Sequence, residues 1–499
     1  MTDSALDTDV LIVGAGPVGL FLANECARRG LRFRIVEDDA TQSEHSKALA
    51  IFPRTLEVFD MAGLVAPFLE AANPVTAVTV MHGERRLASM HFAPEGTPYS
   101  FVAMVPQNVT EQLLLEALRR KGFDVEYETR FITAEQHDDY VTVTLDHKGQ
   151  TSRVNASFVA GCDGAHSAVR HLLNIPFEGA EYKAAFMLGD IQTNDTFPSH
   201  ELLLCSSEAG PLAVFPMSAT RRRMVATIDQ QEGDAPSLEL VQKVVAQRAP
   251  AAFKVTGLNW SSYFHIHHRH VSKLRVGRFF VAGDAAHIHS PFGGQGMNTG
   301  LQDAWNLVWK LDLYLHGHGN EDLLDSYSTE RLPVIRGVIH TTDFLTKTLG
   351  TPNKVVEALR DAVIPMVSRL APFQHAFVRR LSELGIAYDG SPIVEGPGKR
   401  YWDNSLRGGN GIRSRFLLIL DAASNAETRQ SAELLTQQFP DVVEFRQSPH
   451  AGITLVRPDG YITYPGPISD GASALDAVRL LLEKQTGTDH PNSRPSHAA

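Results

Sequence analysis

The feature that most constrains the fold lies near the start of the chain, where a glycine-rich turn joins a strand to a helix. Residues 9–13 (DVLIV) form a short apolar run typical of a strand, and GAGPVG follows directly. In this spacing Gly14 permits a tight turn, Gly16 lets backbone approach a pyrophosphate, and Gly19 lets helix and strand pack closely. Pro17 opens the expected helix. The sequence therefore predicts a dinucleotide-binding turn.

An acidic residue follows at the place where such units hold a ribose. The expected helix spans 17–29 and ends before Gly30, and a second strand is expected at 32–36. Glu37 comes at the end of that strand, 18 residues after Gly19. Its carboxylate can accept hydrogen bonds from ribose hydroxyls, while the helix N-terminus favours phosphate charge. The unit by itself does not choose between NAD and FAD.

Composition excludes several classes of protein. A chain of 499 residues accommodates about three domains, or two with large insertions. Its net charge of -11 gives no electrostatic basis for binding nucleic acid or an anionic membrane. Cys26, Cys162 and Cys205 are too far apart for a disulfide framework or a zinc motif. The N-terminus is acidic and no long apolar run follows, so we expect a cytoplasmic protein that does not span a membrane.

Later segments repeat the strand–turn–helix pattern. A helix is expected at 108–121 with Asn108 as its cap, and another at 238–248. Strands at 157–160 and 278–282 each lead into a glycine- and aspartate-bearing turn, GCDG and GDAAH. Apolar residues at helical spacing predict a long helix over 294–314. The pattern is that of an α/β protein.

The C-terminal part is expected to be a separate small α/β domain. A Pro/Gly-rich joint, DGSPIVEGPGKR, spans 389–400. After it come the strand-like FLLILD, the helix-like AETRQSAELLTQQF and the strand–turn–strand pattern ITLVRPDGYITY. The last residues, 486–499, are polar and contain proline, so a disordered tail is expected.

Three separated motifs together resemble those of a known family. GCDGAHSAVR (161–170) looks like the DG motif of flavin-dependent aromatic hydroxylases, and AGDAAHIHSPFGGQGMNTGLQDAWNLVWKL (282–311) looks like their GD motif and following helix. With GAGPVG they match, in order, the signature of the class A flavoprotein monooxygenases over roughly residues 8–345. Residues 401–485 resemble the thioredoxin-like domain of the phenol hydroxylase and polyketide hydroxylase branch, most closely at RPDGYITY.

The resemblance implies a Rossmann-like FAD-binding domain interleaved with a mixed-sheet substrate domain, followed by the thioredoxin-like domain. The expected divisions are an FAD-binding domain over 1–180 with a substrate-domain insertion at about 75–105, a substrate-binding sheet domain over 181–275, completion of the FAD domain with helices over 276–390, the thioredoxin-like domain over 395–485, and the tail over 486–499.

The resemblance also implies roles for single residues. Asp284 would bind the ribityl chain of FAD, Asp163 would lie near the pyrophosphate, and Gln107 would contact the cofactor. Lys47 stands where many relatives carry arginine, and lysine keeps the charge but loses the bidentate fork. The predicted cofactor-binding residues are Gly14, Gly16, Pro17, Gly19, Glu37, Lys47, Gln107, Asp163, Asp284, Pro291, Gly294, Gly296, Met297 and Asn298.

The segment PFGGQGMN (291–298) is expected to lie against the flavin ring. Its glycines let backbone approach a flat ring, and the helix that follows directs its N-terminus at it. Such an end stabilises negative charge by about 0.3–1 kcal/mol when exposed, which favours reduced, anionic flavin. The backbone of Pro291, Gly293 and Gly294 is therefore the predicted catalytic surface, with no side-chain base and no metal.

The implied reaction is that of the family. NAD(P)H, a transient cosubstrate, reduces FAD; dioxygen then forms a flavin hydroperoxide, whose distal oxygen passes to an electron-rich aromatic substrate. Phenol hydroxylase relatives carry an acid a few positions before the RTLE segment, where this chain has Leu49. That departure favours a polyketide-like ring over simple phenol. It leaves open Baeyer–Villiger insertion or oxidative inactivation of a drug-like molecule. A homodimer also stays open.

Several arginines, histidines and apolar residues carry further expectations. Arg170 is either an anion partner or a surface arginine, and 221–223 (RRR) is expected to be solvated. The histidine-rich run HIHHRH at 265–270 is expected to be strand, not a metal site. The predicted pocket walls are Phe52, His82, Phe92, Met187, Phe215 and Met217.

Overall fold

The structure is a computed structural model that describes residues 6–43, 46, 48–228, 230–289, 293–350, 370–409, 415–449, 452–466 and 471–486. The side chains of 181–184, 265–267, 344–350, 371 and 409 are outside this description. Two predicted site residues, Lys47 and Pro291, and all of the predicted tail except Thr486 also lie outside it. Within the described part, no helix is long and apolar enough to cross a bilayer.

The first sheet is built around the N-terminal strand. β1 (Thr8–Val13) pairs in parallel with β2 (Phe33–Val36) on one side and with β10 (Gln150–Gly161) on the other. β10 pairs in parallel with β17 (Phe279–Val281). Parallel strands require crossover connections, and α1 (Pro17–Arg29) supplies the one between β1 and β2. The predicted β-α-β unit is present, and its helix ends before Gly30, at φ 77°.

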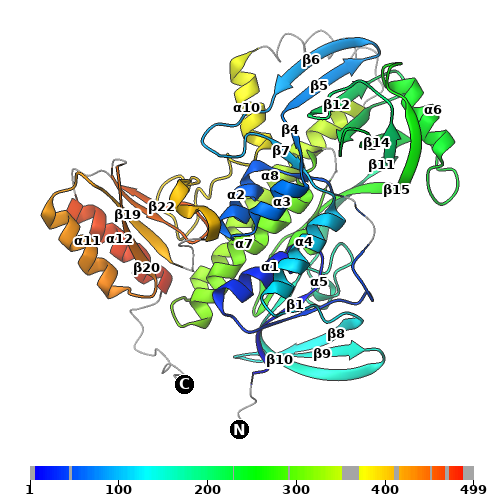
Figure 1. The fold of residues 1–499 in the computed structure, drawn as a ribbon. Coiled ribbons are helices and arrows are strands. Elements are labelled where there is room, and N and C mark those ends of the chain that lie inside the picture. The colour runs from blue at the N-terminus through cyan, green and yellow to red at the C-terminus, as the bar shows by residue number, and fades with distance from the viewer. Residues whose placement is uncertain are drawn as a thin grey trace.

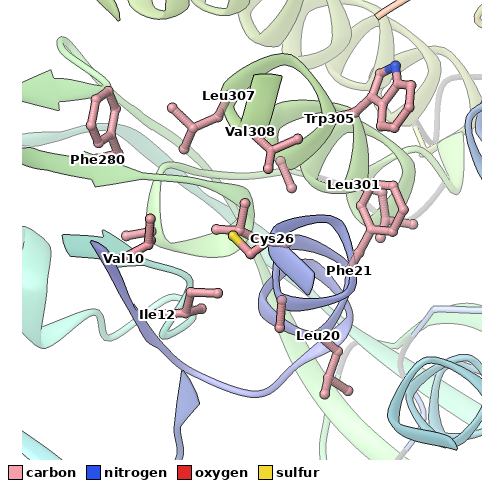
Figure 2. Packing of buried hydrophobic residues seen from close by; sticks show 14 of the residues in the cluster. Val10, Ile12, Leu20, Phe21, Cys26, Phe280, Leu301, Trp305, Leu307 and Val308 are labelled. Carbon is pink, nitrogen blue, oxygen red and sulfur yellow. The ribbon is translucent and has the colours of Figure 1, made fainter. Parts of the chain in front are cut away.

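Apolar side chains from distant segments join this sheet to two helices. Val10 and Ile12 of β1 pack with Phe21 of α1, and with Leu301 and Trp305 of α7 (Gly296–Leu315), as Figure 2 shows. Nearly every side chain of α7 from 297 to 313 is buried, so this helix runs through the centre of the molecule (Figure 1). The sheet and its first helix are therefore fixed by a segment about 280 residues away.

The edges of this sheet carry antiparallel additions. β16 (Arg275–Val276) pairs with β17, and the first half of β10 pairs with β9 (Val141–His147), which in turn pairs with β8 (Thr129–Gln136). α4 (Gln107–Arg120) packs on α1. Its cap residue is Pro106, so the prediction that Asn108 caps this helix is wrong: Asn108 already lies in the first turn.

The second sheet is a mixed sheet of eight strands, covered on one face by α6 (Leu238–Arg248). Alternate residues of each strand face α6, and those between face the opposite side. In order, its strands are β18 (His287–Ile288), β15 (Val255–Val271), β11 (Phe177–Thr193), β14 (Arg221–Ile228), β13 (Leu212–Pro216), β12 (Glu201–Ser206), β5 (Ala77–His82) and β6 (Arg85–His91).

Smaller elements connect the two sheets. A three-stranded sheet has the order β3 (Ala50–Ile51), β7 (Val102–Met104), β4 (Asn73–Val75). The remaining elements of this part are α2 (Pro53–Met61), α3 (Val65–Ala71), α5 (Ala168–Leu172), the 3-10 helix η1 (Gly283–Ala285), α8 (Glu321–Gly350) and α10 (Ala371–Leu381).

The C-terminal part forms its own four-stranded sheet with two helices. β19 (Phe416–Asp421) pairs in parallel with β20 (Val443–Ser448) and antiparallel with β21 (Ile453–Val456), which pairs with β22 (Ile462–Gly466). α11 (Ala426–Gln438) and α12 (Gly471–Thr486) pack against this sheet, and η3 (Asn404–Gly409) precedes it. Each element predicted here from the sequence is found.

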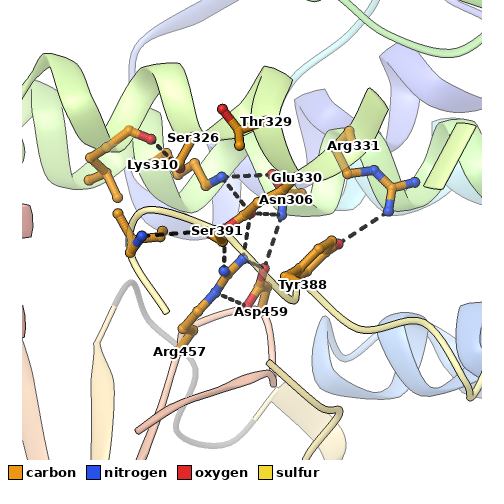
Figure 3. A network of polar contacts seen from close by, with 12 residues as sticks. Asn306, Lys310, Ser326, Thr329, Glu330, Arg331, Tyr388, Ser391, Arg457 and Asp459 are labelled. Carbon is orange, nitrogen blue, oxygen red and sulfur yellow. Dashed lines mark hydrogen bonds and ion pairs between the residues drawn. The ribbon is translucent and has the colours of Figure 1, made fainter. Parts of the chain in front are cut away.

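A buried polar network attaches this C-terminal part to the central helices (Figure 3). Arg457, in the turn between β21 and β22, donates to Glu330 of α8 at 2.5 and 2.9 Å, and Lys310 of α7 donates to the same carboxylate at 2.8 Å. The carbonyl of Asp459 accepts from the indole of Trp305 at 3.0 Å. Burial opposes the charge, but Arg457 and Lys310 hold the pKa of Glu330 well below its usual range. Burial lowers the pKa of Lys310 to about 8.

Candidate active site

The three glycine-bearing turns predicted from the sequence meet at one edge of the first sheet. The backbone N–H of Cys162 donates to the carbonyl of Val13 at 2.7 Å, and that of Ala282 donates to Gly161 at 3.0 Å. β1, β10 and β17 are parallel, so their carboxyl ends reach the same edge. That edge is where open α/β sheets bind their ligands.

The glycines of the first turn differ in what surrounds them. A Cβ on Gly14, whose φ is 101°, would lie 2.4 Å from the carbonyl oxygen of Cys162, and one on Gly19 would lie 1.9 Å from that of Gly14. These two positions exclude any side chain because backbone packs against them. A Cβ on Gly16 meets nothing within 4 Å. Space beside Gly16 at the N-terminus of α1 fits the approach of a pyrophosphate.

The third turn packs against the first through small residues. A Cβ on Gly283 would lie 2.8 Å from Cγ2 of Val18, and one on Gly300 of α7 would lie 2.9 Å from the Cα of Gly283. Gly283 has a φ of 61°, in the left-handed region that favours glycine. Asp284 is exposed between the buried Gly283 and Ala285. Its carboxylate is therefore on the side of η1 away from the packed core.

Glu37 lies at the same edge, at the end of β2. Its Oε2 accepts from the backbone N–H of Ala15 at 2.7 Å, and its Oε1 accepts from that of Asp39 at 3.1 Å. The carboxylate thus fixes the first glycine turn from the neighbouring strand end. Glu37 follows β2 directly, as expected, and its role as a ribose partner stays a prediction.

Gln107 positions the segment that precedes β3. Its Oε1 accepts from the N–H of Ala48 at 3.1 Å, its Nε2 donates to Glu111 at 2.9 Å, and its backbone N–H donates to Oγ of Ser46 at 2.9 Å. Lys47, between Ser46 and Ala48, is not described. Burial raises the pKa of Glu111 to about 7, and the nearby carboxylate of Glu37 also raises it.

The second turn is held by its own aspartate. Asp163 accepts from Oγ of Ser167 at 2.5 Å and from the N–H of Val169 at 3.1 Å, and Ser167 caps α5. Arg170 is only 2% exposed and donates to the carbonyls of Ala285 at 2.9 Å and Ala165 at 2.7 Å. The interpretation of Arg170 as a surface arginine is wrong, because its guanidinium ties the second turn to the third.

A buried triad behind the third turn was not predicted from the sequence. Asp303 of α7 accepts from the N–H of Gly283 at 3.2 Å, from Nε2 of His287 at 2.7 Å and from Nε of Arg331 at 2.7 Å. Burial opposes its charge, but Arg331 and His287 keep the pKa of Asp303 below its usual value. The sequence did carry a signal: a charged residue within the apolar helix expected over 294–314.

The segment expected to face the flavin ring packs on β3 and α2. Gly294 has a φ of 63°, and a Cβ there would lie 3.4 Å from that of Ala50. Asn298, fully buried, accepts from the N–H of Phe52 at 2.9 Å and donates to the carbonyls of Ala50 at 2.9 Å and Gly294 at 3.1 Å. Pro291 is outside the described residues. The described part, 293–298, is therefore anchored at its helix end.

Apolar side chains gather next to this segment. Leu49, Phe52 and Phe92 are buried in one cluster, and Phe215 and Met217 of the second sheet pack against it. Four of the six predicted pocket walls are thus together. The prediction is wrong for Met187, which lies under α6 on the other face of the sheet, because successive strand residues point to opposite faces. It is also wrong for His82, outside this cluster at the end of β5, where its Nδ1 lies 3.1 Å from Oγ of Ser206.

Two arginines expected in solvent are buried instead. Arg222 and Arg223 are each 2% exposed and form ion pairs with Asp195 and Asp190, both at 2.7 Å; Arg221 is exposed. Arg223 also donates to the carbonyl of Ala48 at 3.1 Å. The solvated interpretation of these residues is wrong because β14 is covered on both faces. Arg223 joins the second sheet to the segment beside β3.

The histidine-rich run forms part of β15, as expected. The side chains of His265 and His267 are not described. Among the side chains that are described, no three or more His, Cys, Asp or Glu residues are grouped as metal ligands would be.

Several known proteins are similar to this chain in sequence and in fold. Residues 7–342 match the family described as FAD binding domain. A rifampicin monooxygenase of Streptomyces venezuelae is 31% identical over 92% of this chain and 95% of its own length. A 6-methylpretetramide 4-monooxygenase of Streptomyces rimosus is 32% identical over 97% and 96%. The solved anhydrotetracycline hydroxylase OxyS of Streptomyces rimosus superimposes with a TM-score of 0.78 at 27% identity, covering 96% of this chain and 99% of its own. The chain therefore belongs to the FAD-binding-domain family and is a flavin-dependent monooxygenase of the aromatic hydroxylase type.

Proposed function

We propose that this enzyme oxygenates a large, electron-rich aromatic substrate of the polyketide type. The observation that carries the proposal is the meeting of three turns, at Gly14, Cys162 and Gly283, together with an apolar cluster that joins the three-stranded sheet to the second sheet beside the segment 293–298. Leu49 supports the choice of substrate. It is buried in that cluster and cannot remove a phenolic proton, so the ring has to be reactive without such help.

The proposed cofactor site follows the convergence of the turns. Gly16, with Pro17 and the N-terminus of α1, faces the pyrophosphate, Glu37 lies by the ribose, and Asp284 accepts from the ribityl hydroxyls. Gly14, Gly19, Gln107 and Asp163 shape the site through their packing and hydrogen bonds. Lys47 stays a predicted partner of the pyrophosphate. At the ring we place the backbone of Pro291, Gly293, Gly294, Gly296, Met297 and Asn298.

The residues of the chain would position the flavin and the substrate, exclude water from them and stabilise charge on the flavin. When bound, the flavin takes electrons from NAD(P)H and activates dioxygen for transfer of one oxygen atom to the substrate. The N-terminus of α7 presents positive partial charge toward the ring position. Phe52 and Phe92 are buried beside the same segment and keep that side dry. No side-chain base is assigned.

A second outcome of the same chemistry is insertion of oxygen in the Baeyer–Villiger manner or oxidative inactivation of a drug-like molecule. The specific observation in its favour is the similarity to a rifampicin monooxygenase over nearly the full length of both chains. The geometry is compatible with both outcomes, because both need a reduced flavin beside a dry substrate pocket.

We also propose the domain division expected from the sequence. The pairing of β5 with β12 supports an inserted substrate segment within the FAD-binding domain at about 75–105. A thioredoxin-like fold for 395–485 is supported by the strand order β20-β19-β21-β22, with β19 and β20 parallel and joined through α11. Dioxygen as cosubstrate, a homodimer and a cytoplasmic location stay predictions.

The test is a substrate panel on the purified yellow holoenzyme, with NADPH and NADH in parallel. Tetracyclic aromatic polyketides, a rifamycin and simple phenols are compared by how much each accelerates flavin reduction, and products are analysed for added oxygen and ring integrity. A ring-intact hydroxylated polyketide supports the proposal. An opened or expanded ring supports the second outcome. Acceleration by simple phenols alone would contradict both.

A further inference from the structure

Glu383 combines two features that rarely occur together. It follows the last turn of α10 with a φ of 61°, the left-handed conformation that helix ends usually assign to glycine. It is also only 3% exposed. Glu128, Lys148 and Asn174 share the left-handed φ, but none of them is buried. Backbone strain of this kind is typical of functional positions.

The carboxyl group of Glu383 lies against α7. Nε2 of Gln302 donates to its Oε2 at 2.5 Å, and the nearby side chain of Gln295 helps to lower its pKa. Gln295 and Gln302 are seven residues apart and so share one face of the helix start. Gln295 is the cap residue of α7 and belongs to the segment 293–298. Glu383 is therefore directly behind the segment proposed to face the flavin.

The end of α10 that carries Glu383 is packed next to α2. The N–H of Arg54 donates to the carbonyl of Ser382 at 3.2 Å, and Gln302 also donates to Oγ1 of Thr55 at 3.4 Å. The N–H of Phe52, at the start of α2, is bound by Asn298. The segment 382–383 thus closes a ring of contacts that joins the end of α10, the start of α2 and the start of α7.

The arginines near Glu383 form ion pairs with other carboxylates. Arg54 of α2 pairs with Glu57 at 3.0 Å, and Arg331 of α8 pairs with Asp303 at 2.7 Å and donates to the hydroxyl of Tyr388. Within the described residues Glu383 has no ion pair, and its Oε1 has no hydrogen-bond partner of standard geometry. Burial raises the pKa of Glu383 to about 8, although Gln302, Arg331, Gln295 and Arg54 oppose the rise.

We infer that Glu383 is a positioning residue for the segment 293–298, which it holds as a neutral carboxylic acid through its hydrogen bond with Gln302 of α7 and its proximity to Gln295. The inference rests on the proposed placement of the flavin at this segment. Ionisation of Glu383 places an uncompensated negative charge behind the N-terminus of α7. That charge offsets the positive partial charge of the helix N-terminus, which is the feature proposed to stabilise reduced flavin.

The experiment compares the wild-type holoenzyme with Glu383→Gln between pH 6 and 9.5. The glutamine side chain has the shape of a glutamic acid side chain and can still hydrogen-bond through its amide, but it cannot ionise. The quantity measured is the ratio of affinities for reduced and oxidised FAD, obtained from the midpoint potentials of bound and free flavin. We expect the ratio to fall about two- to five-fold around pH 8 in the wild type and to stay level in Glu383→Gln. Glu116→Gln, exposed on α4, should follow the wild type.

A second readout does not need flavin. A folded-state pKa above the unfolded one means that the folded apoprotein holds a proton that the unfolded chain releases. The stability of the wild type should therefore fall, relative to Glu383→Gln, as pH rises from about 4.5 to 8. Glu383→Gly, which also relieves the left-handed strain, serves if the glutamine variant does not fold.

The outcomes separate the two proposals. Identical pH profiles of the affinity ratio in wild type and Glu383→Gln, with FAD bound to both, would overturn the role of Glu383 and leave the flavin site standing. A pH-independent stability difference in the apoprotein would overturn it as well. Wild-type protein that binds no FAD would instead contradict the proposed flavin site, and the role of Glu383 at that site with it.

Discussion

Single residues at the first turn carry different tasks although all are glycine. Gly14 has a left-handed φ and backbone within 2.4 Å of its missing Cβ, while Gly16 has an ordinary φ of −70° and open space. The fold therefore needs Gly14, whereas the open space at Gly16 supports its proposed role beside the pyrophosphate. From the motif alone, the role of each glycine was inferred by analogy. The surroundings of Gly14 and Gly16 now distinguish a packing role from space for a ligand.

A pair of alanine substitutions tests this difference. Gly14→Ala should lower the free energy of unfolding by about 2 kcal/mol or more, because it combines a strained φ with a clash against Cys162. Gly16→Ala should leave the unfolding transition unchanged but weaken FAD binding about tenfold or more. Thermal unfolding of the apoprotein and flavin titration measure the two effects. Equal loss of stability in both variants would contradict the assignment.

Asp284 offers a test of the third turn. It is exposed, so Asp284→Ala should fold with the wild-type unfolding midpoint. We expect the purified variant to be colourless or weakly flavinated, since it lacks an acceptor for the ribityl hydroxyls. Asp389→Ala, in the loop before the C-terminal part, is the control and should stay yellow. A fully flavinated, active Asp284→Ala protein would show that this turn is misplaced.

Glu111 should make the stability of the protein depend on pH. Its pKa is raised to about 7 in the folded protein, so the folded state holds a proton that the unfolded chain has released. Stability is then lost as pH rises from about 4.5 to 7. Glu111→Gln should be more stable than wild type by about 1–2 kcal/mol at pH 8 and about equal at pH 4.5, measured by urea unfolding. Glu116→Gln, exposed on the same helix, should show no such gain.

At the scale of elements, the hydrogen bonds of Asn298 join α7 to β3 and α2. The N–H of Phe52 and the carbonyls of Ala50 and Gly294 all depend on this one buried amide. The helix was predictable from apolar spacing, because that spacing is local. Its anchoring was not, because the partners at 50–52 lie about 246 residues away.

Asn298→Ala should therefore destabilise the protein more than an ordinary surface change. It leaves the N–H of Phe52 and the carbonyl of Ala50 buried without partners, at a cost of about 2–4 kcal/mol. We also expect reduced flavin occupancy, because the segment 293–298 loses its anchor. Asn194→Ala, at an exposed position, is the control for unfolding and flavin content.

Strand faces show where local patterns stop being informative. The second sheet is buried on parts of both faces. Apolar residues in its strands therefore alternate with other apolar residues or with paired charged residues. The alternation along a strand then does not indicate which face lies on the substrate side. Met187 and Phe186 are neighbours, yet only Phe186 is on the face that carries Phe215. The buried pairs of Arg222 and Arg223 escaped prediction for the same reason.

At the scale of the whole molecule, a turn of the C-terminal part enters the centre of the protein. Arg457 and Asp459 reach α7 and α8, and the carbonyl of Asp459 also accepts from Arg54 of α2 at 3.0 Å. Figure 3 shows Arg457 and Asp459 converging with Asn306 and Glu330 of the central helices. The C-terminal part thus contributes to the stability of the helices that support the proposed flavin site.

Removal of Arg457 tests this coupling. Arg457→Ala leaves Glu330 and Asp459 as buried charges and should cost about 3–5 kcal/mol of unfolding free energy, with loss of flavin as a consequence. Arg479→Ala removes a partly exposed arginine of the same C-terminal part and should change little. Unfolding in urea and flavin content after gel filtration are the measurements. Near-equal behaviour of the two variants would show that the network does not couple the two parts.

The sequence by itself determined the β-α-β unit, the order of the three motifs and most helices and strands, because turn chemistry and apolar periodicity act over a few residues. The tertiary structure alone decided what those motifs touch: which glycine is closed off and which is open, which arginines are buried, and that Asp303 and Glu383 stand behind the site. These outcomes depend on contacts between segments hundreds of residues apart, where burial and pairing, rather than local preference, set the energy of a polar group.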